Sequence, residues 1–264
     1  MSSEPAIEVS HVGKTFAVAG RQVRVFDDLS YGIAKGSFLS IVGPSGCGKS
    51  TLLRLISGLE SPTSGTVLFG GKPIKGPPPG MIYVFQQYSK SIFPWRTVLQ
   101  NIEFGLRARP QKLARAESRE RCMHYLRLVG LEGHEDYFPS QLSGGMQQRV
   151  VIARALICEP DVLLMDEPFS AVDAMTRAIL QELLLKIWTN LGITILFVTH
   201  DIDEAVFLSS RILSLGKAPR AIQEDIAIDL GYPRDQITTR DSPRFTAIRH
   251  RLFSSIFQQE KALA

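Results

Sequence analysis

The chain has 264 residues, of which 44% are apolar, and this size suits one large folded domain or one domain with an inserted subdomain. Its 30 Lys and Arg against 26 Asp and Glu give a formal charge of +4, an excess too small to favour nucleic acid as a partner. No apolar run approaches the roughly 20 residues that cross a bilayer, and the start of the chain lacks the segments of a secretion signal. Three cysteines without disulfide or metal spacing are typical of a reduced compartment.

Apolar runs bounded by turn residues predict several strands in the first third of the chain. They lie at residues 6–10, 23–26, 38–42, 66–69 and 81–85. A helix is expected from Lys49 to Gly58, because glycine commonly ends a helix. The proline-rich segment 77–80 is unsuited to a helix or a central strand, so we expect a surface loop there.

The pattern changes to helical from about residue 97 to residue 158, where strand signals are few. Beyond this stretch, buried strands alternate with helices, which predicts a mostly parallel sheet covered on both faces. The strands are expected at residues 162–165, 193–198 and 211–215, and the helices at residues 179–188 and 203–208. In the tail, residues 227–230 favour a last strand, and Ser242-Pro243 favours the start of a helix. The whole pattern predicts an α/β fold with a helical insertion.

A Gly-x-x-x-x-Gly-Lys-Ser loop joins the expected strand at 38–42 to the helix that begins at Lys49. Its glycines let successive backbone N–H groups point into one concavity, and the helix adds its positive N-terminal end, so the loop is suited to hold phosphates. Lys49 would reach the outer phosphates as a point charge, and the Ser50 hydroxyl would bind Mg²⁺. The residues expected to contact the nucleotide here are Gly43, Pro44, Ser45, Gly46, Cys47, Gly48, Lys49, Ser50 and Thr51.

Two further segments carry groups suited to phosphate chemistry. Asp166 and Glu167 follow a buried strand, at the end where ligands bind in open α/β sheets. Asp166 would hold the metal ion or its water, and Glu167 would activate the attacking water. Ser143, Gly144 and Gly145 open a predicted helix and offer a hydroxyl, backbone donors and a helix end to an anion. Two phosphate-binding elements with one acidic pair suggest two half-sites, although simple helix caps would also explain both segments.

The segment Leu142-Ser143-Gly144-Gly145-Met146-Gln147-Gln148-Arg149 resembles the signature of the ATP-binding subunits of ABC transporters, and the other family motifs occur in order over about residues 5 to 220. The resemblance implies that Gln86 contacts Mg²⁺ and senses the membrane partner. Ser170 to Asp173 resemble the D-loop, which adds Asp173 to the nucleotide-binding residues. His200 would contact the γ-phosphate, beside Glu167 and Lys49 as catalytic groups. Phe16 would stack on adenine, with a plain core role as the alternative.

The resemblance implies the fold and its divisions as well. We expect a P-loop NTPase (RecA-like) core with a mostly parallel sheet, an N-terminal antiparallel β subdomain and an inserted α-helical subdomain. The ATPase domain would span residues 5–220, with the helical subdomain at about 97–158. Residues 221–264 would be a C-terminal extension of the same domain. ATP and Mg²⁺ are the ligands that the family implies, the metal being held by Ser50, Gln86 and Asp166.

For function, the resemblance implies an ATP-hydrolysing subunit that energises an importer from the cytoplasmic face of the inner (plasma) membrane. Two copies, or this chain and a paralogue, would pair head to tail and share the two ATP molecules. The segment Gln86–Arg96 would contact transmembrane permease subunits. Within it, Ile92, Phe93 and Trp95 would either line a groove for a permease helix or fill the core. A periplasmic or extracellular solute-binding protein would take part indirectly, and no nucleic acid is expected.

Two stretches point to one branch of this family. Residues 83–95 and 232–245 resemble the importers of nitrate, sulfonates, taurine and bicarbonate, which implies a small oxyanion-type solute. The alternatives are the ATPase of an ABC exporter, a soluble ABC ATPase outside transport, and a nucleotide-binding module without turnover. The sequence itself does not name the solute, because the cassette touches ATP and membrane subunits rather than the cargo.

Overall fold

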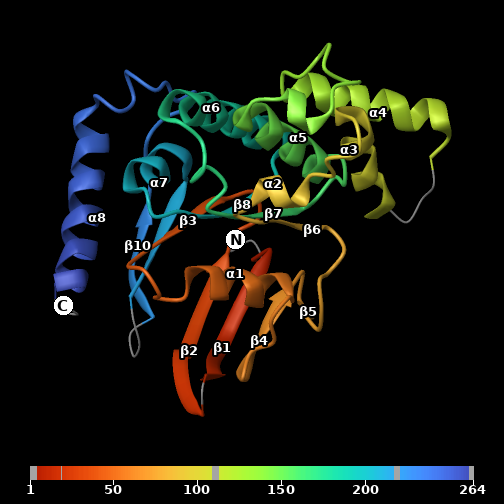
Figure 1. Cartoon of the computed structure of the whole chain (residues 1–264). Coiled ribbons are helices and arrows are strands. Elements are labelled where there is room, and N and C mark those ends of the chain that lie inside the picture. Colours follow the sequence, from red (N-terminus) through yellow and green to blue (C-terminus); the bar gives the residue numbers. More distant parts are fainter. Residues whose placement is uncertain (1–4, 19, 109–112, 217–220, 262–264) are drawn as a thin grey trace. The chain divides into compact units, whose positions relative to one another are not determined.

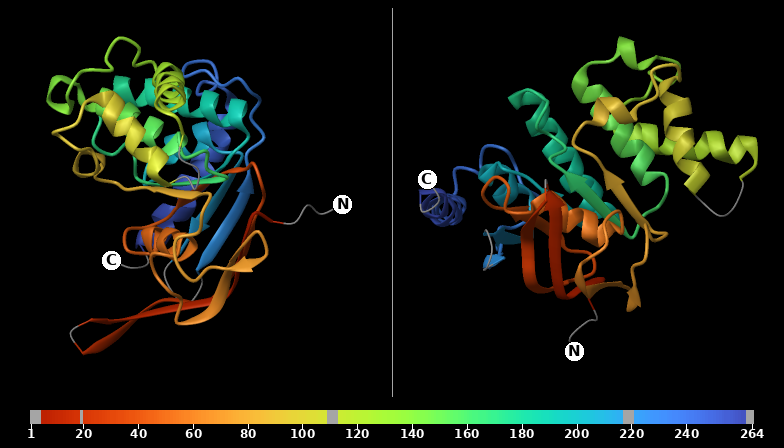
Figure 2. Two further views of the ribbon diagram at one scale, coloured as in Figure 1. Left: turned by 90° about the vertical axis from the view of Figure 1, so that its right-hand side faces the viewer. Right: turned by 60° about the horizontal axis from the view of Figure 1, so that its bottom comes forward.

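The computed structural model describes residues 5–18, 20–108, 113–216 and 221–261. The chain forms two compact units, the first made of Met1–Pro78 with Gly192–Ala264 and the second of Pro79–Leu191 (Figures 1 and 2). Each unit is described on its own below. The domain limits inferred from the sequence stay a prediction. Residues 1–4, on which the expectation about a secretion signal depends, and the domain limit at residue 220 lie outside the described residues.

The first unit contains an antiparallel sheet with the strand order β2-β1-β4-β5 (Figure 1). Its strands are β1 (Ile7–Val18), β2 (Arg21–Ile33), β4 (Ser64–Phe69) and β5 (Lys72–Pro73). The sequence pattern located β1 and β2 but made both too short, because β-bulges along β1 interrupt the alternation of apolar residues. The antiparallel N-terminal sheet expected for the fold is confirmed.

The second sheet region of the first unit is centred on β3 (Phe38–Val42), all of whose residues are buried. Two strands pair with it in parallel, β8 (Thr194–Val198) and β9 (Arg211–Leu215). In the described part of this unit the helices are α1 (Lys49–Ser57), α7 (Ile202–Leu208) and α8 (Pro243–Lys261). Gly58 ends α1 in the left-handed conformation, as the sequence predicted.

The expected last strand at residues 227–230 is wrong. The strand is β10 (Ile222–Ala227), which pairs antiparallel with β9. Every second residue from Ile222 is at least partly buried while polar Gln223 and Asp225 are exposed, and these polar residues conceal the strand in the sequence. The apolar residues that misled the prediction lie just beyond it, where the Ile228 amide donates to the Ser210 carbonyl at 2.9 Å.

The second unit combines two parallel strands with helices. Strand β6 (Met81–Val84) pairs with β7 (Val162–Asp166). The helices are α2 (Tyr88–Ser91), α3 (Val98–Gly105), α4 (Arg115–Leu128), α5 (Gly144–Leu156) and α6 (Ala174–Leu191), with short 3₁₀ turns η1 (Leu106–Ala108) and η2 (Pro139–Gln141). Helix α3 contacts both α4 and α5, so the stretch that the sequence marked as helical does pack as a helical layer. Within the described ranges, none of the helices has the length and apolar character needed to span a membrane.

Candidate functional site

The loop between β3 and α1 depends on glycines at two tight points. A Cβ on Gly43 would lie 2.3 Å from the Leu215 carbonyl oxygen, and one on Gly48 would lie 2.5 Å from Val25. Gly48 also adopts φ 103° as the residue that precedes α1, a conformation that L side chains avoid. The loop therefore brings its backbone close to neighbouring strands and turns directly into the N-terminus of α1. That is the arrangement in which N–H groups and the helix dipole favour an anion.

The Lys49 side chain folds back over this loop. Its ammonium group donates to the Gly43 carbonyl at 2.8 Å and to the Pro44 carbonyl at 3.0 Å, and the residue is only 8% exposed. A positive charge is thus fixed beside the N-terminus of α1, where Ser50 occupies the first turn. Both features favour a strongly charged anion over a neutral ligand.

His200 lies at the same edge of the sheet as the start of the loop. Ile41 of β3 is the register partner of Val198 in β8, and the Thr199 amide donates to the Ile41 carbonyl at 3.3 Å. His200 is exposed directly after this point. Asp201 then caps α7 by accepting from the Glu204 amide at 3.1 Å. The strand end and the helix cap together hold the His200 backbone in place.

Phe16 belongs to β1 in the same unit, and its ring is half-buried. The Lys14 ammonium lies 4.6 Å from the centroid of that ring. Because the ring is neither fully buried nor fully exposed, its stacking on adenine remains a prediction.

In the second unit, the acidic pair lies at the carboxyl end of β7. Asp166 is 6% exposed and accepts a hydrogen bond from the Tyr83 hydroxyl at 2.9 Å. Glu167 has the uncommon φ of 45° and accepts from the Gln86 amide at 3.1 Å. Gln86 follows β6, the parallel neighbour of β7, so the sheet itself brings these two side chains together. No sequence pattern predicted the contact of Tyr83 with Asp166, because the two residues are distant along the chain.

The segment at Ser143 begins helix α5. The Ser143 hydroxyl caps the helix by accepting from the Met146 amide at 3.3 Å. A Cβ on Gly145 would lie 2.2 Å from the Thr176 methyl group at the start of α6, so this position needs a glycine. The Thr176 amide also donates to Asp173 at 3.0 Å, and the Thr176 hydroxyl and amide lower the pKa of Asp173. Thr176 thus links the two predicted motifs, a role that the sequence did not reveal.

The candidate residues therefore fall into two sets. The first unit holds Phe16, the loop Gly43–Thr51 and His200. The second holds Gln86, Asp166, Glu167, Asp173 and the Ser143 segment. Within the second unit Gln86 and Glu167 are in direct contact, as are Gly145 and Thr176. A site built from both sets remains a prediction.

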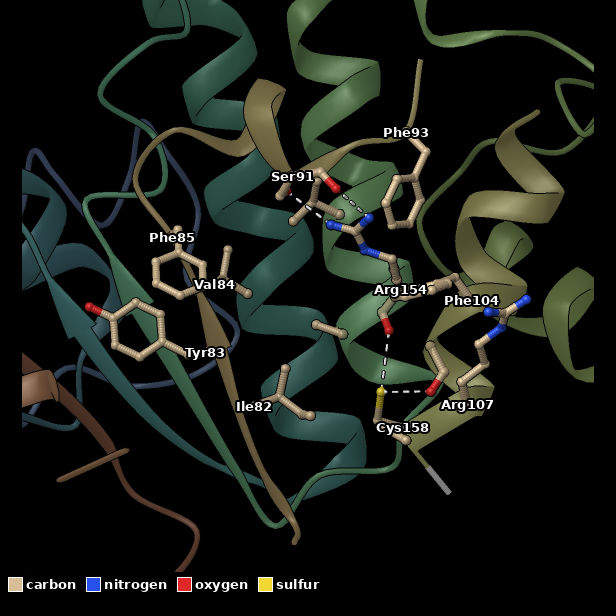
Figure 3. A pocket seen from close by; sticks show the side chains of 14 residues that line it. Ile82, Tyr83, Val84, Phe85, Ser91, Phe93, Phe104, Arg107, Arg154 and Cys158 are labelled. Atoms are coloured by element: carbon tan, nitrogen blue, oxygen red, sulfur yellow. Dashed lines mark hydrogen bonds between the residues drawn. The ribbon is translucent and has the colours of Figure 1, made fainter. Parts of the chain in front are cut away.

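The second unit also contains a mostly apolar pocket of about 430 Å³ (Figure 3). Phe85, Phe93, Phe104, Arg107, Arg154 and Cys158 are among its lining residues. The sequence left two alternatives for the loop at 92–95, a groove for a permease helix or core packing, and its side chains differ in their environment. Ile92 is core, at 4% exposure, Phe93 lines the pocket, and Trp95 is 71% exposed.

Arg154 organises one wall of this pocket. Its guanidinium donates to the Ser91 carbonyl at 2.6 Å and to the Ser91 hydroxyl at 2.9 Å, and it lies 5.6 Å from the Phe93 ring centroid (Figure 3). Burial lowers the pKa of Arg154. On the other side of the loop, Asn101 donates to the carbonyls of Phe93, Arg96 and Thr97 at 3.2, 3.1 and 3.0 Å. Hydrogen bonds from Arg154 and Asn101 therefore hold the backbone of residues 91–97 in place on both sides.

Comparisons with known proteins identify the family of this chain. Residues 26–170 match the family model described as ABC transporter. The chain is 49% identical over 230 residues to an ABC transporter ATP-binding protein of Methanocaldococcus jannaschii, covering 87% of this chain and 85% of that one. It is 42% identical to the nitrate import ATP-binding protein NrtD of Synechococcus elongatus, over 94% of this chain and 90% of the relative. It is also 42% identical to the aliphatic sulfonates import ATP-binding protein SsuB of Bacillus subtilis, over 97% and 96%.

Among solved structures, the fold is similar to a dimeric ATP-binding cassette in a post-hydrolysis state with ADP and Pi. The TM-score is 0.74 at 32% identity, covering 85% of this chain and all of the other, 100%. The match confirms the P-loop NTPase class with its mostly parallel sheet and antiparallel N-terminal sheet. The chain belongs to the ABC transporter family as an ATP-binding subunit, that is, an ATPase coupled to transport.

Proposed function

We propose that this chain binds ATP with Mg²⁺ in a site completed by a second cassette, and that its hydrolysis drives the import of a small oxyanion-type solute. The observation that carries the hydrolytic part is the contact between Gln86 and Glu167 at 3.1 Å beside the buried Asp166. Carboxylate and amide oxygens gathered at the carboxyl end of parallel strands suit a hydrated divalent cation and an attacking water.

Each predicted residue has a specific role in this proposal. Gly43 to Thr51 cradle the phosphates through backbone N–H groups, and Lys49 neutralises the charge of the outer phosphates. Glu167 accepts a proton from the attacking water, and His200 contacts the γ-phosphate. Phe16 stacks on the adenine.

The proposed metal ligands are Ser50, Gln86 and Asp166. They offer hydroxyl, amide and carboxylate oxygens, the hard donors that Mg²⁺ prefers. Asp166 is buried, and the hydrogen bond from the Tyr83 hydroxyl holds its carboxylate in place. When bound, the ion would supply charge neutralisation on the phosphates.

The second cassette is a copy of this chain or a paralogue, arranged head to tail. Ser143, Gly144 and Gly145 of one protomer would face the ATP held by the phosphate loop of the other, with Asp173 nearby. Support comes from the exposed N-terminus of α5, whose orphan N–H groups suit a phosphate, and from the dimeric state of the structural relative.

The apolar pocket of the second unit would receive a helix of a transmembrane permease subunit. Its phenylalanine rings and the exposed Trp95 offer aromatic anchors. The hydrogen-bonded backbone around Phe93 would keep the pocket in one conformation before a helix binds. The subunit would then act peripherally at the cytoplasmic face of the plasma membrane, with a solute-binding protein on the other side.

The oxyanion class is supported by two relatives at 42% identity, one named for nitrate import and the other for aliphatic sulfonates import. Uptake of labelled nitrate, taurine, an alkanesulfonate and bicarbonate should be measured in a strain that lacks this chain, with and without a plasmid copy. Loss of uptake of one of these anions, restored by the plasmid, would support the proposal. Retained uptake of all four combined with a defect in efflux would favour the exporter alternative.

A further inference from the structure

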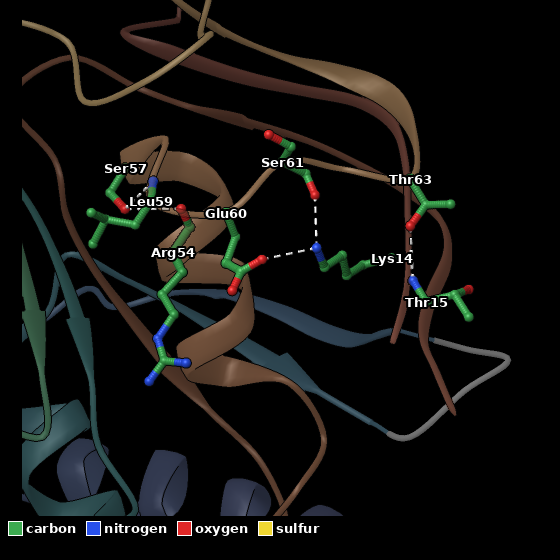
Figure 4. A network of polar contacts seen from close by, with 8 residues as sticks. All are labelled: Lys14, Thr15, Arg54, Ser57, Leu59, Glu60, Ser61 and Thr63. Carbon is green, nitrogen blue, oxygen red and sulfur yellow. Dashed lines mark hydrogen bonds and ion pairs between the residues drawn. The ribbon is translucent and has the colours of Figure 1, made fainter. Parts of the chain in front are cut away.

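Lys14 is a buried lysine beside the ring of Phe16. Only 9% of the residue is exposed. Its ammonium group donates to the Glu60 carboxylate at 3.0 Å and to the Ser61 carbonyl at 2.8 Å (Figure 4). The same ammonium lies 4.6 Å from the Phe16 ring centroid, within the range of a cation–π contact. A charge so far removed from water is held in one position by its partners.

The partners of Lys14 belong to the end of α1. The amides of Leu59 and Glu60 both donate to the Arg54 carbonyl, at 3.0 and 3.1 Å, after Gly58 turns the chain out of the helix. Glu60 is therefore fixed relative to α1, and α1 begins at the phosphate loop. Lys14 thus ties the strand that carries Phe16 to the helix that carries the phosphate site.

A second set of contacts makes this connection rigid. The Thr15 amide donates to the Thr63 hydroxyl at 3.0 Å (Figure 4). The Thr63 amide donates to the Gly13 carbonyl at 2.8 Å. Gly13 is itself confined, because a Cβ there would lie 2.4 Å from the Ser64 hydroxyl. Gly13 and Thr15, on either side of Lys14, are therefore both hydrogen-bonded to Thr63 in the turn that follows α1.

We propose that Lys14 is a positioning residue for the nucleotide base. It rests against one face of the Phe16 ring and holds that ring at a fixed place relative to the phosphate loop, so that the opposite face receives the adenine. A ring that is already ordered loses less rotamer freedom when a base stacks on it, and this favours binding. The proposal rests on the stacking role of Phe16 given above.

The test compares two ligands on the full chain. Lys14→Met keeps an apolar stem but removes the charge, and Lys35→Met, at an exposed lysine, is the matched control for the lost charge. Affinities for ATP and for inorganic tripolyphosphate are measured by titration calorimetry in Mg²⁺. We expect Lys14→Met to weaken ATP by about threefold to tenfold and to leave tripolyphosphate unchanged. Equal weakening of both ligands would mean that Lys14 only supports the fold of the loop, and would overturn the proposal.

A double-mutant cycle with Phe16→Leu separates this inference from the role of Phe16 itself. Unchanged ATP affinity in Phe16→Leu alone would remove the stacking proposal. If Phe16→Leu weakens ATP binding and Lys14→Met weakens it no further in that background, Lys14 acts through the ring, as proposed. Additive effects would overturn the proposal. Should Lys14→Met fold poorly, Glu60→Gln loosens the same ammonium without burying a new group, and it should show the same selective loss for ATP; no selective loss there would count against the proposal.

Discussion

Replacing Arg154 by methionine should release the loop that forms one wall of the apolar pocket. The guanidinium makes two charge-assisted hydrogen bonds to Ser91, at 2.6 and 2.9 Å. Hydrogen bonds to charged groups are worth about 1.5–3 kcal/mol each. Because the methionine chain would still cover part of the Phe93 ring, we expect a net loss of about 2–4 kcal/mol for the closed loop. At 1.4 kcal/mol per factor of ten, local opening should become about 30-fold to 700-fold more frequent.

Hydrogen exchange of the backbone amides of Ser91, Ile92, Phe93, Trp95 and Arg96 measures this opening directly, because exchange reports local unfolding. Binding of detergent-solubilised permease subunits should weaken in parallel, while ATP affinity serves as the control for the fold. Arg107→Met is the matched variant, since Arg107 lines the same pocket and lies 5.2 Å from the Phe104 ring but is exposed. It should change exchange by no more than about fivefold. Unaltered exchange and unaltered permease binding in Arg154→Met would refute the reasoning that Arg154 holds a docking surface.

Three further predictions address the nucleotide site. Glu167→Gln keeps an acceptor for the Gln86 amide, so the variant should bind ATP normally. Its rate of phosphate release should fall at least about 100-fold, and turnover near the wild-type rate would exclude Glu167 as the base. Lys49→Ala should weaken ATP binding at least about tenfold in calorimetry, and retained affinity would contradict the phosphate-loop assignment. Ser143→Arg should abolish hydrolysis while each protomer still binds nucleotide, whereas full activity would argue against a site shared between two cassettes.

The parts of the fold that the sequence predicted well are those specified by neighbouring residues. The phosphate loop follows from one short pattern, because glycine positions and a following helix start are local features. Gly58 and Ser143 likewise marked a helix end and a helix start that the structure has at the same residues. The acidic pair was placed at a strand end by the purely apolar run Val162–Met165 before it.

The contacts that escaped prediction join residues far apart in the chain. Tyr83 reaches Asp166, and Lys14 reaches Glu60, through strand pairing and loop geometry that composition and periodicity do not encode. The pocket wall at Arg154 has the same origin, since Arg154 and Ser91 come from different helices. Strand β10 was misplaced for another reason. Its exposed polar residues concealed the alternation, while the more apolar residues after it attracted the prediction.

Gln148 in the middle of α5 offers a test of why this helix carries a polar core residue. It is 0% exposed, and within the described residues neither its amide oxygen nor its amide nitrogen has a hydrogen-bond partner. An unpaired buried amide destabilises a fold by about 1–3 kcal/mol. Gln148→Met preserves the length of the side chain, so it should raise the free energy of unfolding by that amount. The melting temperature would rise by about 2–4 °C per kcal/mol.

The adjacent Gln147 is the control for this substitution. Its amide donates to the Pro139 carbonyl at 2.9 Å, so Gln147→Met should lower the melting temperature instead. If Gln148→Met also destabilises the chain, its amide must be paired in solution, and the stabilisation argument fails. If Gln148→Met stabilises the chain but slows ATP turnover, the unpaired amide of Gln148 contributes to activity rather than to stability. Helix α5 begins at Ser143, the proposed phosphate contact, and carries Arg154 of the pocket near its other end. A more rigid α5 would therefore affect both the phosphate contact and the pocket.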